Sequence, residues 1–178
     1  MAISAADVKK LREATGAAML DCKNALEQNN GDFGKAMEWL KEKGLAKAAK
    51  KADRLTKDGR VEVYVHPGNR VAVMVEVNCE TDFVAKTEAF QNFTHELALH
   101  IAMANPKYLD VADVPQAELE AVKAEGRPAE KYYEEVCLLK QPFVKNESIA
   151  IGQMLTEAIA AIGENMNIRR FARYELGN

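Results

Sequence analysis

The sequence has few of the residue types on which active sites and disulfide frameworks depend. Its 178 residues include three cysteines and three histidines. Cys22, Cys79 and Cys137 lie far apart, are odd in number and form no CxxC pair. This pattern indicates reduced thiols in a cytoplasmic protein, and it argues against both a disulfide framework and a zinc site.

Long apolar runs and an excess of positive charge are also missing. No run approaches the ~20 apolar residues that a membrane span requires. Residues 1–4 lack the charged-then-apolar order of a signal peptide. The net charge is −3, whereas phosphate binding needs a basic stripe. We therefore expect a cytoplasmic protein with neither a membrane nor a nucleic acid as its partner.

Motifs for catalysis are absent as well. The chain has no phosphate-binding loop, no GxSxG and no dinucleotide fingerprint. His95 and His100 resemble a zinc-protease motif, but their spacing is one residue too long. Five residues on a helix separate two side chains by about 140°, so these histidines cannot share a metal ion. We expect a protein that is not an enzyme and that has no catalytic residue, metal or cofactor.

What the sequence does contain begins with three short helical segments. Their apolar periodicity and caps predict a small bundle over residues 1–45. An alanine- and lysine-rich stretch, residues 46–58, predicts a helical linker. The three helices are expected at residues 4–15, 18–28 and 32–44, with Gly16 and Gly44 as stops.

Two apolar side chains lie off the stripes of these helices, Leu20 and Trp39. They have two interpretations. Each could pack at the edge of the bundle, or together with Met19 they could form an exposed apolar patch that marks a protein-binding surface.

After the linker, apolar and polar residues alternate with a period of two, which predicts a β-hairpin. A two-residue turn would pair Val65 with Ala72 and place the two sets of valines on opposite faces. A three-residue loop would pair Val65 with Val71 and give one continuous valine face. We predict the three-residue loop, because one buried face specifies register strongly. The other face, with Tyr64 and Met74, is then at most half covered.

The remaining chain alternates helical patterns with a closing strand. Together with the hairpin it predicts an α+β core domain over residues 59–178, in which helices pack on a three-stranded antiparallel sheet. The helices are expected at about residues 87–104, 115–125, 128–139 and 148–163, and the third strand at 168–176.

The segment 78–85 joins the second strand to the next helix and combines acceptor side chains with an aromatic. Asn, Asp and Thr at such a junction are typical turn and cap residues. Phe83 does not fit that role. It is either a plug into the protein's own core or a probe into a partner, and the pattern alone slightly favours the plug.

Two long motifs in this sequence resemble the elongation factor Ts family, the guanine-nucleotide exchange factors of elongation factor Tu. They are Leu-Arg-Glu-Ala-Thr-Gly-Ala-Ala-Met-Leu-Asp-Cys-Lys-Asn-Ala-Leu at 11–26 and Glu-Val-Asn-Cys-Glu-Thr-Asp-Phe-Val-Ala-Lys at 76–86. Segments 105–109, 137–145 and 169–171 also resemble the family. Ala18 departs from the glycine or serine usual there, and 115–130 is shorter than in many members. The chain resembles the short forms, which lack the second core subdomain and the coiled coil.

The resemblance implies how the chain would act. The N-terminal bundle would be a ubiquitin-associated-type (UBA-like) domain docking on elongation factor Tu, and the 81–84 segment would push in beside the nucleotide and disturb its phosphate and magnesium site. GDP would leave and GTP would bind, with no nucleotide held by this chain. The residues implied in contact are Leu11, Met19, Leu20, Thr81, Asp82, Phe83 and Val84.

The short forms are homodimers, so the resemblance also implies a second copy of the chain as a partner. An alternative of another class is a UBA-like adaptor whose α+β domain only dimerises and which has no exchange activity. The exposure of Phe83 separates the two, because exchange requires it exposed and the adaptor requires it buried.

Overall fold

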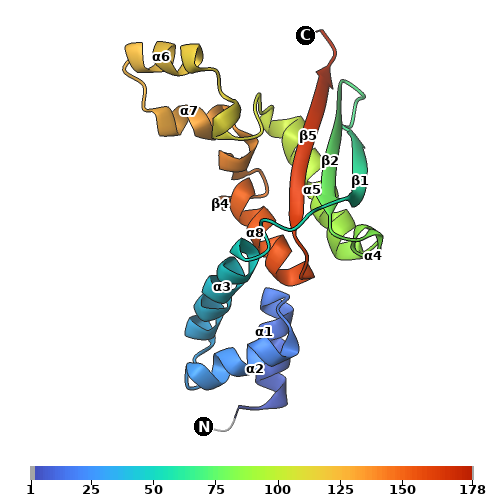
Figure 1. Cartoon of the computed structure of the whole chain (residues 1–178), viewed down its shortest axis with the longest axis vertical. Helices are drawn as coiled ribbons and strands as arrows, with labels where there is room; N and C mark the ends of the chain where they lie inside the picture. Colours follow the sequence, from blue (N-terminus) through green and yellow to red (C-terminus); the bar gives the residue numbers. More distant parts are fainter. Residues whose placement is uncertain (1–2, 178) are drawn as a thin grey trace. The chain divides into compact units, whose positions relative to one another are not determined.

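The computed structural model describes residues 3–177, which divide into two compact units (Figure 1). Unit 1 consists of Met1–Arg54 and Thr156–Asn165, and unit 2 of Leu55–Leu155 and Met166–Asn178. Helix α8 (Ile151–Ile162) therefore contributes residues to both. The predicted boundaries at residues 45 and 58 remain a prediction about independent domains.

Unit 1 is built on α1 (Ala5–Thr15), α2 (Met19–Gln28) and α3 (Phe33–Ala49). The side chain of Ser4 accepts a hydrogen bond from the Asp7 amide at 3.1 Å and caps α1. Asp32 caps α3 in the same way, through the Lys35 amide at 3.0 Å. The three helices enclose one small apolar core, which consists of Val8, Leu11, Cys22, Ala25, Leu26, Ala36 and Leu40.

The predicted end of the third helix at Gly44 is wrong, because α3 continues through it to Ala49. A Cβ atom at Gly44 would lie only 3.0 Å from the Cβ of Ala160 on α8. Glycine at this position therefore allows two helix backbones of unit 1 to approach closely. In the sequence, a glycine required by such a distant contact looks the same as a glycine that ends a helix.

Unit 2 contains the three-stranded antiparallel sheet that the sequence predicts, in an α+β arrangement. Its strands are β1 (Asp58–Val65), β2 (Val71–Cys79) and β5 (Met166–Glu175), and β2 lies in the centre. The register of β5 shifts between Glu76 and Val77 of β2, which leaves Arg169 unpaired in a bulge.

The predicted register of the hairpin is wrong. Val65 pairs with Ala72, so the valines of the two strands point to opposite faces. The loop has Pro67 and Gly68 at its corner, and the Asn69 amide donates to the His66 carbonyl at 3.0 Å. Gly68 adopts φ +92°, which suits the third position of a turn that has proline in the second. The turn chemistry, rather than a shared valine face, determines the register.

Among residues 3–177, helical cover lies on one face of the sheet. Helix α5 (Glu88–Ala104) packs on the face that carries the buried Val73, Val75 and Val77 of β2. On β1 the same face carries Glu62, which is 8% exposed and binds Arg60 at 2.6 Å and His95 at 3.2 Å. The opposite face of the sheet is exposed. Its large apolar side chains are Val61, Val63, Val65, Met74 and Tyr174.

Short elements complete unit 2. A two-stranded sheet of β3 (Pro142–Phe143) and β4 (Asn146–Ala150) precedes α8, which begins three residues later than predicted. Helices α6 (Gln116–Ala124) and α7 (Ala129–Val136) form a pair with a cluster of its own. That cluster consists of Val114, Val122, Tyr132, Val136 and Cys137.

One carboxylate connects the α6–α7 pair to the preceding loop. Glu118 on α6 accepts hydrogen bonds from the phenol of Tyr132 on α7 and from that of Tyr108, the latter at 2.8 Å. The Tyr132 bond, and then the Tyr108 bond, hold the pKa of Glu118 below its ordinary value. The same contact raises the pKa of Tyr132 to about 12.

These shifts predict how the stability of this region depends on pH. A carboxyl whose pKa is lower in the folded chain stabilises it above the ordinary value of 4.5, and this contribution is lost as the pH falls through the lowered pKa. We expect Glu118→Gln to destabilise the protein at pH 7 and to cost less at acid pH. Urea unfolding at both pH values measures this, with Glu120→Gln on the same helix as control. An equal cost at both pH values contradicts the assignment.

Candidate partner-binding site

The junction between the central strand and α5 forms a single helical turn, α4 (Asp82–Ala85). Thr81 caps this turn, since its hydroxyl oxygen accepts a hydrogen bond from the Val84 amide at 3.4 Å. The carbonyl of Thr81 accepts from the Ala85 amide at 3.3 Å. Thr87 then caps α5 through the Phe90 amide. Of the predicted turn and cap residues, Thr81 is therefore confirmed as a cap, whereas Asn78 lies within β2 and Asp82 lies inside the turn. The turn is held between two regular elements.

Phe83 lies on the outside of this turn and is 79% exposed, more than any other large apolar side chain in residues 3–177. A plug into the protein's own core would be buried, so that interpretation is excluded. The side chain is presented to solvent by a backbone that is hydrogen-bonded on both sides of it.

The neighbours of Phe83 are partly exposed and one is charged. Thr81, Asp82 and Val84 are half-buried. The Lys86 ammonium binds the Asp82 carboxylate at 2.6 Å, and this bond holds the pKa of Asp82 below its ordinary value. Lys86 was not predicted as a site residue, although its spacing of four residues from Asp82 is the helical signal for such a pair. The turn thus offers an apolar ring beside a carboxylate that stays ionised.

The other predicted contact residues lie in unit 1, at the start of α2. Met19 is 48% exposed and Leu20 is 69% exposed. Trp39 packs against the bundle core, with the Lys43 ammonium 4.3 Å from its ring centre. Trp39 therefore packs at the edge of the bundle, whereas Leu20 is exposed beside Met19. That this exposed pair binds a partner stays a prediction.

Leu11 requires a correction. Its side chain is completely buried in the core of unit 1. A side chain with no accessible surface cannot contact a partner in this conformation. The resemblance implied a direct contact for Leu11, and its burial in the core does not allow that role.

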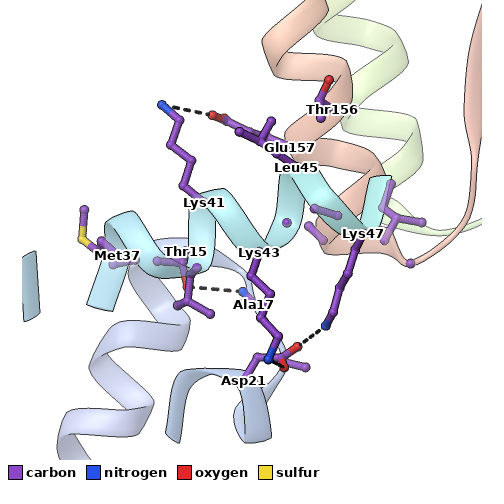
Figure 2. Close-up of a pocket in the computed structure, with 18 of the residues that line it drawn as sticks. Thr15, Ala17, Asp21, Met37, Lys41, Lys43, Leu45, Lys47, Thr156 and Glu157 are labelled. Atoms are coloured by element: carbon purple, nitrogen blue, oxygen red, sulfur yellow. Dashed lines mark hydrogen bonds and ion pairs between the residues drawn. The ribbon is translucent and has the colours of Figure 1, made fainter. Parts of the chain in front are cut away.

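Unit 1 also contains a pocket of about 600 Å³ between the α1–α2 turn, α3 and the last turns of α8 (Figure 2). Lys43 and Lys47 both extend to Asp21, at 3.2 and 2.7 Å, and Lys41 lies 3.9 Å from Glu157. The ion pair with Lys47 is the first cause of the lowered pKa of Asp21. The described residues that line the pocket include no histidine or cysteine, and their acids are paired with lysines. These ion pairs neutralise both acids, and the described lining residues include no nucleophile–base pair.

The described residues, 3–177, offer neither a metal site nor a membrane span. No three His, Cys, Asp or Glu side chains there lie close enough to hold a metal ion together. No helix in that part of the chain is both long and apolar enough to cross a membrane. The candidate site residues are instead exposed apolar side chains, namely Phe83, Leu20 and Met19.

Comparison with known proteins places the chain. The family model described as "Elongation factor TS" matches residues 5–130 and 123–178. Elongation factor Ts of Carboxydothermus hydrogenoformans is 54% identical over 96% of this chain and 87% of its own length. That of Caldanaerobacter subterraneus subsp. tengcongensis is 52% identical over 98% and 97%, and that of Herpetosiphon aurantiacus is 50% identical over the full length of both. The chain therefore belongs to the elongation factor Ts family.

Proposed function

We propose that this chain, as an exchange factor in translation elongation, releases GDP from elongation factor Tu by inserting Phe83 beside the nucleotide. The observation that carries the proposal is the exposure of this ring on a turn fixed between a central strand and a long helix. Burying a Phe side chain is worth about 1.5–3 kcal/mol, which is available only if a partner covers it. A rigid aromatic presented in this way is typical of the anchors that dominate protein interfaces.

The physical mechanism acts on the nucleotide indirectly. GDP is held mainly through its phosphates and a magnesium ion, which requires near-ideal octahedral geometry. Moving the groups around the ion by about an ångström is enough to weaken such a site strongly. Exchange then follows from reciprocity, because a factor that weakens GDP binding is itself weakened by GDP to the same degree. The chain needs no nucleotide pocket of its own for this.

Two further contacts with elongation factor Tu would support Phe83, which acts as a wedge beside the nucleotide. The exposed Met19 and Leu20 form an apolar surface on unit 1 that would dock on elongation factor Tu. Leu11 would support this surface from the bundle core without touching the partner. Asp82, ionised beside Lys86, would offer a charged group next to the ring.

We also propose that the protein is a homodimer formed through the exposed face of the sheet. In the register of the three strands, Val63, Met74 and Ala172 lie side by side in the middle of this face. Val65, Ala72 and Tyr174 form the next row, and Glu76 binds Arg170 at one end at 2.7 Å. An apolar centre with a charged rim is the anatomy of a stable interface. A two-fold axis would use the same face twice.

The adaptor hypothesis requires a buried Phe83 and is not favoured by the exposure of this ring. A measurement of GDP release decides between the two. Elongation factor Tu loaded with a fluorescent GDP is mixed with excess unlabelled nucleotide and increasing amounts of this protein in a stopped-flow instrument. We expect the release rate to rise to a plateau, and no acceleration would reject exchange activity.

A second arm of the same experiment tests the route through magnesium. Chelating the ion with EDTA removes the contact that the wedge is proposed to disturb. We expect the fold-acceleration by this protein to be clearly smaller in EDTA than in magnesium buffer. An equal acceleration in both buffers would show that exchange occurs by another route.

A further inference from the structure

Cys79 is the last residue of the central strand and lies directly before the exposed turn. It pairs with Asp58 of β1 on one side and with Met166 of β5 on the other. Its side chain is completely buried. Its thiol donates a hydrogen bond to the carbonyl of Thr81, with 3.1 Å between Sγ and the oxygen.

We propose that Cys79 is a positioning residue for Phe83, which it orients through the Thr81 carbonyl. The inference rests on the proposed exchange function and adds a residue that contacts no partner. The thiol connects a strand that is paired on both edges to the residue that begins the turn. It therefore transmits the rigidity of the sheet to the segment that carries the ring.

The turn needs such support because it is short. Helix α4 has four residues, and a helical turn of this length is not stable by itself in water. Thr81 holds it twice, through its hydroxyl to Val84 and through its carbonyl to Ala85. A displacement of the Thr81 carbonyl would therefore alter both ends of the turn and the direction of Phe83 between them.

The thiol contact differs from the side-chain ion pair on the same turn. The Asp82–Lys86 pair is open to solvent, with side chains 49% and 73% exposed. Exposed ion pairs contribute little because water and salt screen them. The Cys79–Thr81 contact involves a fully buried thiol, where water does not compete for the donor. If Phe83 is already oriented before binding, less conformational entropy is lost when the complex forms.

The test compares three variants in the GDP-release assay. Cys79→Ala removes the donor, Cys79→Ser restores one of similar size, and Cys137→Ala removes the same volume from a fully buried cysteine in the α6–α7 cluster. The readouts are the maximal release rate and the half-saturating concentration, measured at a temperature where circular dichroism shows each variant folded. Phe83→Ala is run alongside.

We expect Cys79→Ala to lower the maximal release rate by about fivefold to tenfold, the effect of losing one hydrogen bond from the transition state. Cys79→Ser should recover most of the rate, and Cys137→Ala should match the wild type. Equal losses in Cys79→Ala and Cys79→Ser, an equal loss in Cys137→Ala, or a wild-type rate in Cys79→Ala would each overturn the inference. If Phe83→Ala itself exchanges normally, the proposed function fails instead.

Discussion

Replacing Phe83 with alanine should remove most of the acceleration of GDP release and leave the fold intact. Because the ring is 79% exposed, few contacts within the protein are lost. Surface substitutions of this kind change the free energy of unfolding by within about 0.5 kcal/mol. Truncating an aromatic anchor in an interface costs about 2–4 kcal/mol, so we expect the maximal release rate to fall by about 100-fold.

The matched control is Leu55→Ala, which truncates another apolar side chain, 73% exposed and outside the turn. It should exchange like the wild type. Thermal unfolding of both variants is measured beside the stopped-flow traces. A large loss of stability in Phe83→Ala would mean that the ring supports the fold, and an unchanged release rate would remove the wedge from the mechanism.

Replacing Val63 with glutamate should convert a dimer into a folded monomer. Val63 lies on the outer strand β1 and is 58% exposed, so a charge there is tolerated in the isolated chain. In a dimer formed through this face the carboxylate would be buried against apolar side chains without a partner charge. A buried charge without a partner costs about 3–5 kcal/mol, so the dissociation constant of the dimer should rise by more than about 100-fold.

Light scattering at micromolar concentration measures the outcome. The wild type should have twice the chain mass of 19.7 kDa, and the Val63→Glu variant should have a mass near that of one chain. Leu55→Glu adds the same charge at an exposed position off the sheet face and should remain a dimer. A wild-type protein of single-chain mass would contradict the dimer, and a dimeric Val63→Glu would place the interface elsewhere.

Local signals in the sequence predicted the caps, the fold class and the order of most elements. Ser4 and Asp32 cap their helices because a short acceptor side chain before a helix has few other uses. The sequence around Gly44 could not show that the helix continues there. This glycine is required by the close approach of Ala160, which lies more than a hundred residues later in the chain. Propensity describes the neighbourhood in sequence, and tertiary packing overrides it.

The predicted register of the hairpin was wrong for a different reason. The valines of the hairpin do not share a single buried face, because those of β2 lie under α5 and those of β1 are exposed to solvent. Both sets are apolar, so the pattern cannot tell a face buried within a chain from a face that a second chain would cover. The same ambiguity affected Phe83, whose exposure depends on how the turn leaves the sheet.

The division of α8 between the two units has a consequence for synthesis on the ribosome. Unit 1 begins at the N-terminus but includes Thr156–Asn165, against which Gly44 packs closely. The first 54 residues therefore emerge about 110 residues before their last structural partner, a delay of roughly 5–20 s at the usual rates of translation. During that interval Gly44 lacks the helix that packs against it. Unit 1 therefore reaches its final form only after Thr156–Asn165 has emerged.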